Sequence, residues 1–318
     1  ARFVACAGAS YTPAMPRISG TYTAIVTPFS PTDGSIDLAR LEEHIRFQAA
    51  GGVTGIVPCG TTGEAPTLEE REQAAVIETS IRVGKPLGLQ VVAGTGSNST
   101  AHAVHLHRSA HALGADLSLQ VAPYYNKPSQ EGIYRHFMAV ADSCSLPIML
   151  YNIPGRCGVA IAPETVERLA RHPNIVAIKE ATGSMDSASE IRQRCGITIL
   201  SGDDTLTLAF AAVGAVGVVS VLSNIVPDRV SRLCSLAQSN DFAAARVEHA
   251  SLFALARGLL TIDTNPAPIK AAMQVLGRDS GVLRLPMCAL PATGLARVRD
   301  LLRAVGLEPA ADFAGAIQ

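Results

Sequence analysis

Long apolar runs, net charge and closely paired cysteines are all scarce in this sequence of 318 residues. No segment approaches the roughly 18–20 apolar residues that a membrane-spanning helix needs, so we expect no transmembrane helix. The formal net charge is −1, and neither a nucleic acid nor an anionic membrane is therefore an expected partner. Charged residues make up 17% and hydrophobic residues 48%, which favours a large core or a sizeable subunit interface.

The sequence also lacks a CxxC pair and a recognisable signal-peptide pattern at its start. Cysteines at irregular intervals are typical of reduced thiols in a cytoplasmic protein. Residues 1–16 lack the charged-then-apolar order of a signal peptide, and we expect Met15 to be the natural start. We predict that residues 1–19 form a poorly ordered extension. The cysteines are Cys6, Cys59, Cys144, Cys157, Cys195, Cys234 and Cys288.

What the sequence does contain is an alternation of short β-branched runs with amphipathic segments. The runs begin at intervals of roughly 30 residues, the length of a βα unit. They are almost continuously apolar, as parallel strands covered on both faces must be. The eight runs are Thr23–Pro28, Gly55–Pro58, Gly88–Ala93, Leu117–Ala122, Ile148–Asn152, Ile175–Lys179, Ile197–Ser201 and Val216–Val221.

The segments between the runs carry helix signals at their ends. One helix is predicted to begin after Asp37, a good N-cap, and to end at Gly51. A second has Thr67 as its N-cap, with Glu70 three residues later completing a capping box. A third begins with Pro163 in its first turn.

Eight βα units are the number that closes a (β/α)8 TIM barrel, and residues 20–239 suffice for one. Helical patterns without strands continue over 240–318, which predicts a C-terminal helical appendage packed against the barrel. A doubly wound open sheet is the alternative, but it usually carries a glycine fingerprint after its first strand. The nearest match, GTGSNST at 94–100, lacks the third glycine and the acidic partner.

Chemistry in such barrels lies at the carboxyl ends of the strands, so polar groups there are the candidates. Singly, each has an ordinary explanation as a solvated, packing or capping residue, and Asp203 and Asp204 are interpreted as caps of the next helix. Their convergence on one rim favours a function. The groups are Thr61, Thr62, Gly63 and Glu64; Tyr124 and Tyr125; Tyr151 and Arg156; Lys179 and Glu180; Gly202, Asp203 and Asp204; and Ser220 to Asn224.

Lys179 stands where a buried strand emerges, and loss of hydration there lowers the pKa of an ammonium group. A neutral amine can attack a ketone and form a Schiff base, which then acts as an electron sink. Tyr151 on the neighbouring strand can move protons, and Arg156 suits a substrate carboxylate. The hydroxyls and amides of Thr61 and Thr62 can hold a second carboxylate. This set predicts an aldolase or lyase acting on an α-keto acid, with no cofactor and no metal.

Four histidines, at positions 102, 105, 107 and 111, lie within one helical segment. His107 and His111 are four residues apart, a spacing that can hold a metal ion. No carboxylate or cysteine accompanies them, so we interpret the segment as a solvated outer helix of the barrel.

Six motifs follow one another in order: GTTGE (60–64), YYNKPSQEG (124–132), YNIPGRCG (151–158), IKEATG (178–183), SGDD (201–204) and TNPAPIK (264–270). Together they resemble the dihydrodipicolinate synthase family, within the N-acetylneuraminate lyase superfamily, over about residues 20–290. The resemblance implies condensation of pyruvate with L-aspartate 4-semialdehyde, leading to diaminopimelate and lysine. It also implies a cytoplasmic homotetramer that needs no cofactor.

The resemblance implies a role for each matching residue. Lys179 corresponds to the Schiff-base lysine and Tyr151 to a tyrosine that shuttles protons. Thr62 corresponds to the threonine linking that tyrosine to a second one, Tyr125, which the family contributes across a subunit interface. The substrate-binding positions are Thr61 and the amide of Thr62 for the carboxylate of pyruvate, Arg156 for that of aspartate semialdehyde, and Gly202 and the Val219 carbonyl in the pocket.

Arg156 and the threonine pair distinguish the chain from the sialic acid lyases, which typically have serine for the first threonine and no arginine at the mouth. Cys157 is a departure, since the family usually has threonine there. Two alternatives stay open. One is another lyase of the superfamily, acting on a 2-keto-3-deoxy sugar acid or on hydroxy-oxoglutarate. The other is a catalytically silent barrel that binds an α-keto acid.

The resemblance also implies an allosteric lysine site at a subunit interface. Replacing the family's glutamate by His102 removes a carboxylate that pairs with the ammonium of lysine, and Glu70 compensates only in part. We therefore predict weak or absent feedback inhibition by lysine. The positions concerned are Ala65, Pro66, Glu70, Gln73, Asn98, His102 and Tyr124.

Overall fold

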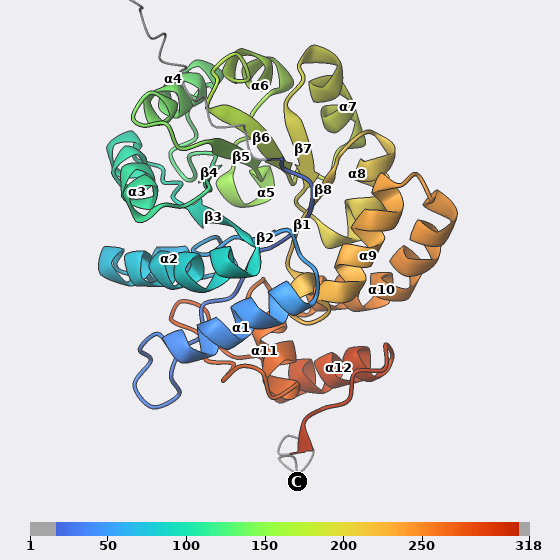
Figure 1. Cartoon of the computed structure of the whole chain (residues 1–318). Helices are drawn as coiled ribbons and strands as arrows, with labels where there is room; N and C mark the ends of the chain where they lie inside the picture. Colours follow the sequence, from blue (N-terminus) through green and yellow to red (C-terminus); the bar gives the residue numbers. More distant parts are fainter. Residues whose placement is uncertain (1–16, 312–318) are drawn as a thin grey trace, which may run out of the picture.

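Eight parallel strands close into a barrel in sequence order, with β8 pairing with β1 (Figure 1). The computed structural model describes residues 17–311. The predicted (β/α)8 fold is therefore confirmed. The strands are β1 Gly20–Thr23, β2 Gly55–Ile56, β3 Gln90–Gly94, β4 Leu117–Val121, β5 Ile148–Asn152, β6 Ile175–Glu180, β7 Thr198–Ser201 and β8 Gly217–Ser220.

The first predicted strand is misplaced. The run Thr23–Pro28 is apolar and buried, but the strand β1 occupies Gly20–Thr23, so it ends where the predicted strand begins. Beyond Ala24 the chain leaves the sheet, and the amide of Val26 donates to the Asn224 side chain instead of to a strand. Burial against the C-terminal helices, where Val26 packs, accounts for the apolar composition. Residues 1–16 of the predicted extension lie outside the described part.

Helices follow each strand and continue after the last. Asp37 caps α1 as predicted, by accepting from the Arg40 amide. The predicted cap of α2 is wrong: a 3-10 turn, Ala65–Thr67, intervenes, and Glu69 with Glu72 forms the capping box. The helices are α1 Leu38–Ala50, α2 Glu70–Gly84, α3 Thr100–Leu113, α4 Gln130–Ala141, α5 Pro154–Cys157, α6 Pro163–Leu169, α7 Met185–Arg194, α8 Thr207–Ala212, α9 Pro227–Gln238, α10 Phe242–Ile262, α11 Ala267–Val275 and α12 Ala292–Arg303, with 3-10 turns η1 Ala65–Thr67, η2 Lys85–Leu87, η3 Asp204–Leu206 and η4 Leu222–Asn224.

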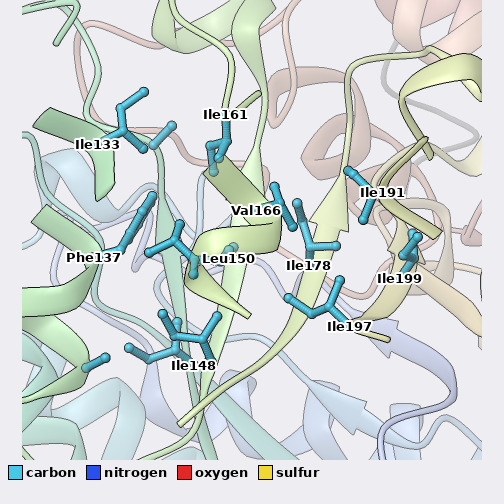
Figure 2. Packing of buried hydrophobic residues seen from close by; sticks show 14 of the residues in the cluster. Ile133, Phe137, Ile148, Leu150, Ile161, Val166, Ile178, Ile191, Ile197 and Ile199 are labelled. Atoms are coloured by element: carbon cyan, nitrogen blue, oxygen red, sulfur yellow. The ribbon is translucent and has the colours of Figure 1, made fainter. Parts of the chain in front are cut away.

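Two apolar layers hold the barrel together. The strands bury one set of side chains inside the barrel and the other set beneath the helices, because side chains alternate along a strand. Figure 2 shows part of the outer layer, with Ile148, Leu150 and Ile178 from strands packed beside Phe137 and Val166 from helices. Each fully buried side chain of this kind contributes about 1.5–3 kcal/mol to the free energy of folding. The apolar layers cover the faces of the strands, so the polar groups gather at the strand ends.

The C-terminal helices α10 to α12 pack on the side of the barrel where β8, η4 and α9 lie (Figure 1, orange to red). Val218 of the barrel, Leu255 of α10 and Ile269 of α11 belong to one buried cluster. This confirms the predicted helical appendage over the residues described. Among the described helices, none is long and apolar enough to cross a membrane.

Candidate active site

Lys179 and Tyr151 lie side by side at the carboxyl ends of two neighbouring strands. They are direct partners in the register of β5 and β6. Lys179 points to the same side of its strand as Ala177, and Tyr151 to the same side as Met149, both of which line the barrel interior. The Nζ of Lys179 lies 4.1 Å from the centroid of the Tyr151 ring. The two therefore share the mouth of the barrel.

The amine of Lys179 is buried and has no polar partner within the described residues. Only 5% of the residue is exposed, and Nζ makes neither a hydrogen bond nor an ion pair there. Burial lowers its pKa from 10.5 to about 8, although the carboxylates of Asp203 and Asp204 act in the opposite direction. At pH 7 about a tenth of this amine is therefore uncharged, far more than for an ordinary lysine, and the uncharged form is the nucleophile.

The phenol of Tyr151 is kept protonated by its surroundings. Burial raises its pKa well above the usual value, and the negative charge of Asp203 adds to this. The positive charge of Arg156 and a hydrogen bond with the Thr61 side chain act to lower it. A neutral phenol beside a neutral amine can donate a proton to an oxygen that leaves during condensation.

The contacts of Thr61 and Thr62 differ from the expected ones. The hydroxyl that bonds with Tyr151 is that of Thr61, not Thr62. Thr62 is buried, and its hydroxyl accepts from the side-chain amide of Asn265, 2.9 Å away. Thr61 rather than Thr62 is therefore the threonine that contacts Tyr151, and the expected link onward to Tyr125 stays a prediction. The chain turns sharply over residues 58–64, which sends neighbouring side chains in different directions.

Arg156 lies on the short helix α5, directly after β5, and lines the same cavity as Tyr151. Its guanidinium is exposed and donates to the carbonyl of Asn265 at 3.1 Å. This contact leaves further N–H groups of the guanidinium for a ligand. Cys157, the departure from the family pattern, is buried in the cavity wall, and burial raises the pKa of its thiol to about 11.

Gly202 directly follows β7 and Val219 lies within β8, the two strands that come after β6 around the barrel. A Cβ added to Gly202 would approach the Cβ of Ala181 to 2.5 Å, so the backbone passes too close for any side chain. Val219 belongs to β8 and is fully buried in the interior cluster that contains Tyr151. Neither residue lines the cavity beside Tyr151, so their expected place in the substrate pocket stays a prediction.

Tyr125 points away from this chain's own site. It is 88% exposed, has a positive φ of 74°, and its amide donates to the carbonyl of Cys157. Tyr124 lines the cavity instead. The expected role of Tyr125 across a subunit interface stays a prediction.

One cavity joins Tyr151, Thr61 and Arg156 to most of the expected regulatory positions. It measures about 1230 Å³, including the part open to solvent. Asn98 lies beside it and donates to the carbonyl of Tyr124. Glu70 faces His102 and His105 on the exposed surface, with its carboxylate 3.7 Å and 3.2 Å from their ring nitrogens. The lining includes Thr61, Ala65, Pro66, Gln73, His102, Tyr124, Tyr151 and Arg156.

Asp204 is not a cap of its own helix. Its carboxylate accepts from the Ser220 hydroxyl and from the amides of Val221 and Leu222, and so it holds the turn that follows β8. Asp203 precedes η3, but its side chain makes no capping bond there. Burial raises the pKa of both carboxyl groups, and the charge of Lys179 lowers it.

The histidine helix is not uniformly solvated. His107 is fully buried and shares a hydrogen bond with Ser118 of β4, and burial lowers its pKa to about 4. His102, His105 and His111 are exposed. The interpretation as a solvated face therefore fails for His107, because this side of α3 packs on the sheet.

The sequence-based reasoning assigned no role to Asn265 or Lys270, although both lie in the TNPAPIK motif. Asn265 contacts Thr62 through its side chain and Arg156 through its carbonyl. Lys270 forms a buried ion pair with Glu64. The signal that points to them is a polar residue just before an apolar helix, Asn265, and a lysine within it, Lys270.

Known proteins are similar to this chain in both sequence and fold. The sequence profile of the Dihydrodipicolinate synthetase family matches residues 17–305. The 4-hydroxy-tetrahydrodipicolinate synthase of Pelobacter propionicus is 47% identical over 91% of this chain and 99% of its own. The solved structure of that synthase from the methanotroph Methylacidiphilum fumariolicum SolV has a TM-score of 0.88 at 47% identity, covering 91% and 96% of the two chains. A chloride-inhibited dihydrodipicolinate synthase from Acinetobacter baumannii, in complex with pyruvate, has a TM-score of 0.88 at 38% identity, covering 92% and 100%.

The fold and the site define a lyase of the Schiff-base (class I) aldolase type. A buried amine at the carboxyl end of a TIM barrel, beside a phenol, is the arrangement that this chemistry needs. The chain belongs to the dihydrodipicolinate synthetase family.

Proposed function

We propose that the protein condenses pyruvate with L-aspartate 4-semialdehyde to give 4-hydroxy-tetrahydrodipicolinate and water. The observation that carries the proposal is the buried, unpaired amine of Lys179 beside the ring of Tyr151. The relatives named as 4-hydroxy-tetrahydrodipicolinate synthase and the pyruvate complex of a related structure support it.

The reaction follows from these groups in three steps. The neutral amine of Lys179 adds to the C2 carbonyl of pyruvate, and water leaves as the Schiff base forms. Loss of a proton from the methyl carbon gives an enamine, which attacks the aldehyde carbon of the second substrate. The amino group of that substrate then displaces Lys179 from C2, closing the ring and freeing the lysine. Tyr151, backed by Thr61, donates and recovers the protons.

The remaining residues bind the two carboxylates. The Thr61 hydroxyl and the Thr62 amide hold the carboxylate of pyruvate, and Gly202 and the Val219 carbonyl shape the pocket around it. Arg156 at the cavity mouth receives the carboxylate of the aldehyde. Tyr125, exposed here, enters the site of a neighbouring subunit.

Trapping with borohydride tests the proposal directly. The chain contains four lysines, Lys85, Lys127, Lys179 and Lys270. After incubation with pyruvate and borohydride, we expect mass spectrometry to find one reduced adduct, on Lys179. An assay with aspartate semialdehyde then decides the second substrate. Turnover with a different aldehyde alone would assign the protein to another activity of the superfamily, and no turnover with any aldehyde would favour a silent binding barrel.

Replacing Arg156 by alanine is expected to raise the KM for the aldehyde about 10–100-fold, because a charged hydrogen-bonding partner of the carboxylate is lost. The half-saturation for pyruvate in imine formation should stay within about twofold of the wild type. Arg156→Lys keeps the charge without the forked geometry and should lie between the two. Steady-state kinetics with each substrate varied separately gives the answer, and equal effects on both substrates would remove the assignment.

Weak or absent inhibition by lysine remains our proposal for regulation. The carboxylate of Glu70 lies 3.7 Å from His102, and both side chains are exposed rather than enclosed. Initial rates measured with increasing lysine test this, and a steep fall at low lysine concentration would refute it.

The homotetramer, a dimer of dimers, is likewise proposed. The exposed Tyr124 and Tyr125 support it, since large apolar side chains are seldom left in solvent together. Sedimentation equilibrium should report four times the chain mass, and a monomer mass would contradict the role of Tyr125 in a neighbouring site.

A further inference from the structure

A buried ion pair lies beside the active site and has no part in the mechanism described above. Lys270 of α11 is fully buried, and its Nζ donates to Glu64 at 2.8 Å. The other two N–H groups donate to the carbonyls of Thr27 at 2.8 Å and Val282 at 2.6 Å. All three donors of the ammonium group are therefore satisfied.

The carboxylate of Glu64 is satisfied from both sides. One oxygen accepts from Lys270, and the other accepts from the backbone amide of Arg284 at 3.0 Å. The guanidinium of Arg284 in turn forms two bonds of 2.6 Å with Glu72 at the start of α2. The segment after α11 is thereby tied to the loop between β2 and α2.

This network holds the turn that contains Thr61 and Thr62 through hydrogen bonds. Glu64 has a φ of 55°, a left-handed conformation that a residue with a side chain seldom adopts without support. The preceding carbonyl, of Gly63, accepts from the Thr27 hydroxyl at 2.7 Å. Thr61 and Thr62 come immediately before, so the anchored backbone sets where their hydroxyl and amide groups point.

The segment just before α11 reaches the site by a second route. Asn265, five residues before Lys270, donates to the Thr62 hydroxyl and accepts from Arg156. A buried charge pair costs desolvation energy, and an apolar pair of similar volume is often as stable, so stability alone does not account for it. Fixed directions of hydrogen bonds do account for it, because an apolar pair supplies none.

We propose that the Lys270–Glu64 pair is a positioning device that holds the turn at Thr61 and Thr62 in the geometry needed to bind the carboxylate of an α-keto acid. Neither residue touches the substrate. The proposal rests on the proposed function, in which this turn receives the carboxylate of pyruvate.

Three variants test the pair: Lys270→Met, Glu64→Gln and the double variant Glu64→Leu with Lys270→Met. Lys270→Met leaves Glu64 buried without its partner, so the midpoint of urea unfolding should fall and the half-saturation for pyruvate in borohydride trapping should rise. The double variant should regain the midpoint. Its half-saturation should remain about tenfold above that of the wild type, because the anchor is still missing.

Glu64→Gln keeps the side-chain shape and covers the case in which the others fail to fold. Its amide group can accept from Lys270 or from the Arg284 amide, but not from both, so the half-saturation should rise about threefold or more. Glu248→Gln is the matched control, because it breaks the partly buried pair with Arg229 between α9 and α10, away from the turn. It should leave the half-saturation for pyruvate unchanged even where the unfolding midpoint falls.

A folded double variant or Glu64→Gln protein with the pyruvate half-saturation of the wild type would overturn the proposal. So would a rise of equal size in Glu248→Gln, since loss of stability would then explain the effect. Failure of the wild type to form any pyruvate adduct is a different result, which would refute the proposed function. The trapping experiment on the wild type therefore separates the two.

Discussion

Replacing Lys179 with methionine is expected to lower turnover by at least about 10⁴-fold, because the covalent intermediate has no other nucleophile. Methionine keeps the apolar stem over the Tyr151 ring and removes the amine. The pyruvate adduct trapped by borohydride should disappear from the mass spectrum. Lys85→Met is the control, since Lys85 lies at the surface paired with Asp116 and its loss should change neither rate nor trapping.

The same substitution is expected to stabilise the protein. A fall in the pKa of Lys179 from 10.5 to about 8 means that the folded state resists protonation, at a cost of about 3 kcal/mol below pH 8. Between about pH 8 and 10.5 the unfolded state binds more protons, so the stability of the wild type rises with pH there. Lys179→Met should exceed the wild type by about 1–3 kcal/mol at pH 7, and the gap should close towards pH 10.5.

Denaturant unfolding at pH 7 and pH 10 measures this difference, and the rate of imine formation provides a second check. The rate should rise with pH through about 8, where half of the amine is neutral, rather than near 10.5. A Lys179→Met protein that is inactive but less stable at both pH values would contradict the account of a desolvated amine. Residual trapping would move the nucleophile to another lysine.

Tyr151→Phe is expected to lower kcat about 10²–10³-fold, because the proton donor and acceptor of the condensation is removed. The phenyl ring still fills the space beneath Lys179, so the fold and the burial of the amine are retained. Borohydride should therefore still label Lys179, more slowly than in the wild type. Loss of kcat with labelling retained is the pattern that separates a proton-transfer role from a packing role.

Tyr134→Phe is the matched control for this variant. The ring of Tyr134 lies under Arg168 on the outside of the barrel, 3.9 Å from the guanidinium carbon, and takes no part in the site. It should leave both kcat and labelling unchanged. A Tyr151→Phe rate equal to that of the wild type would remove the assigned role.

Thr61→Val should show a smaller loss of kcat than Tyr151→Phe, since it disturbs the phenol without removing it.

Sequence patterns predicted the structure correctly where the environment of a segment in the fold is the one that its composition suggests. β5 occupies Ile148–Asn152 as predicted, and Asp37 caps α1. The prediction failed at Thr23–Pro28, where burial by helices 200 residues later produces the same apolar pattern as a strand. The prediction of a solvated histidine face failed at His107, because helical periodicity does not show which polar side chain finds a hydrogen-bond partner on the sheet, here the Ser118 hydroxyl.

The barrel and the place of its chemistry are predictable from the sequence, because apolar runs recurring about every thirty residues form parallel strands whose carboxyl ends meet at one rim. Among the polar residues at that rim, the chemistry of an amine beside a phenol and the resemblance to the family single out Lys179 and Tyr151. Only the tertiary structure decided that Thr61, and not Thr62, meets Tyr151, and that Lys270 reaches Glu64 across 206 positions of sequence. Packing sets both the direction of a side chain in a turn and the contacts between distant segments. Neither produces a periodic pattern in the sequence that could predict it.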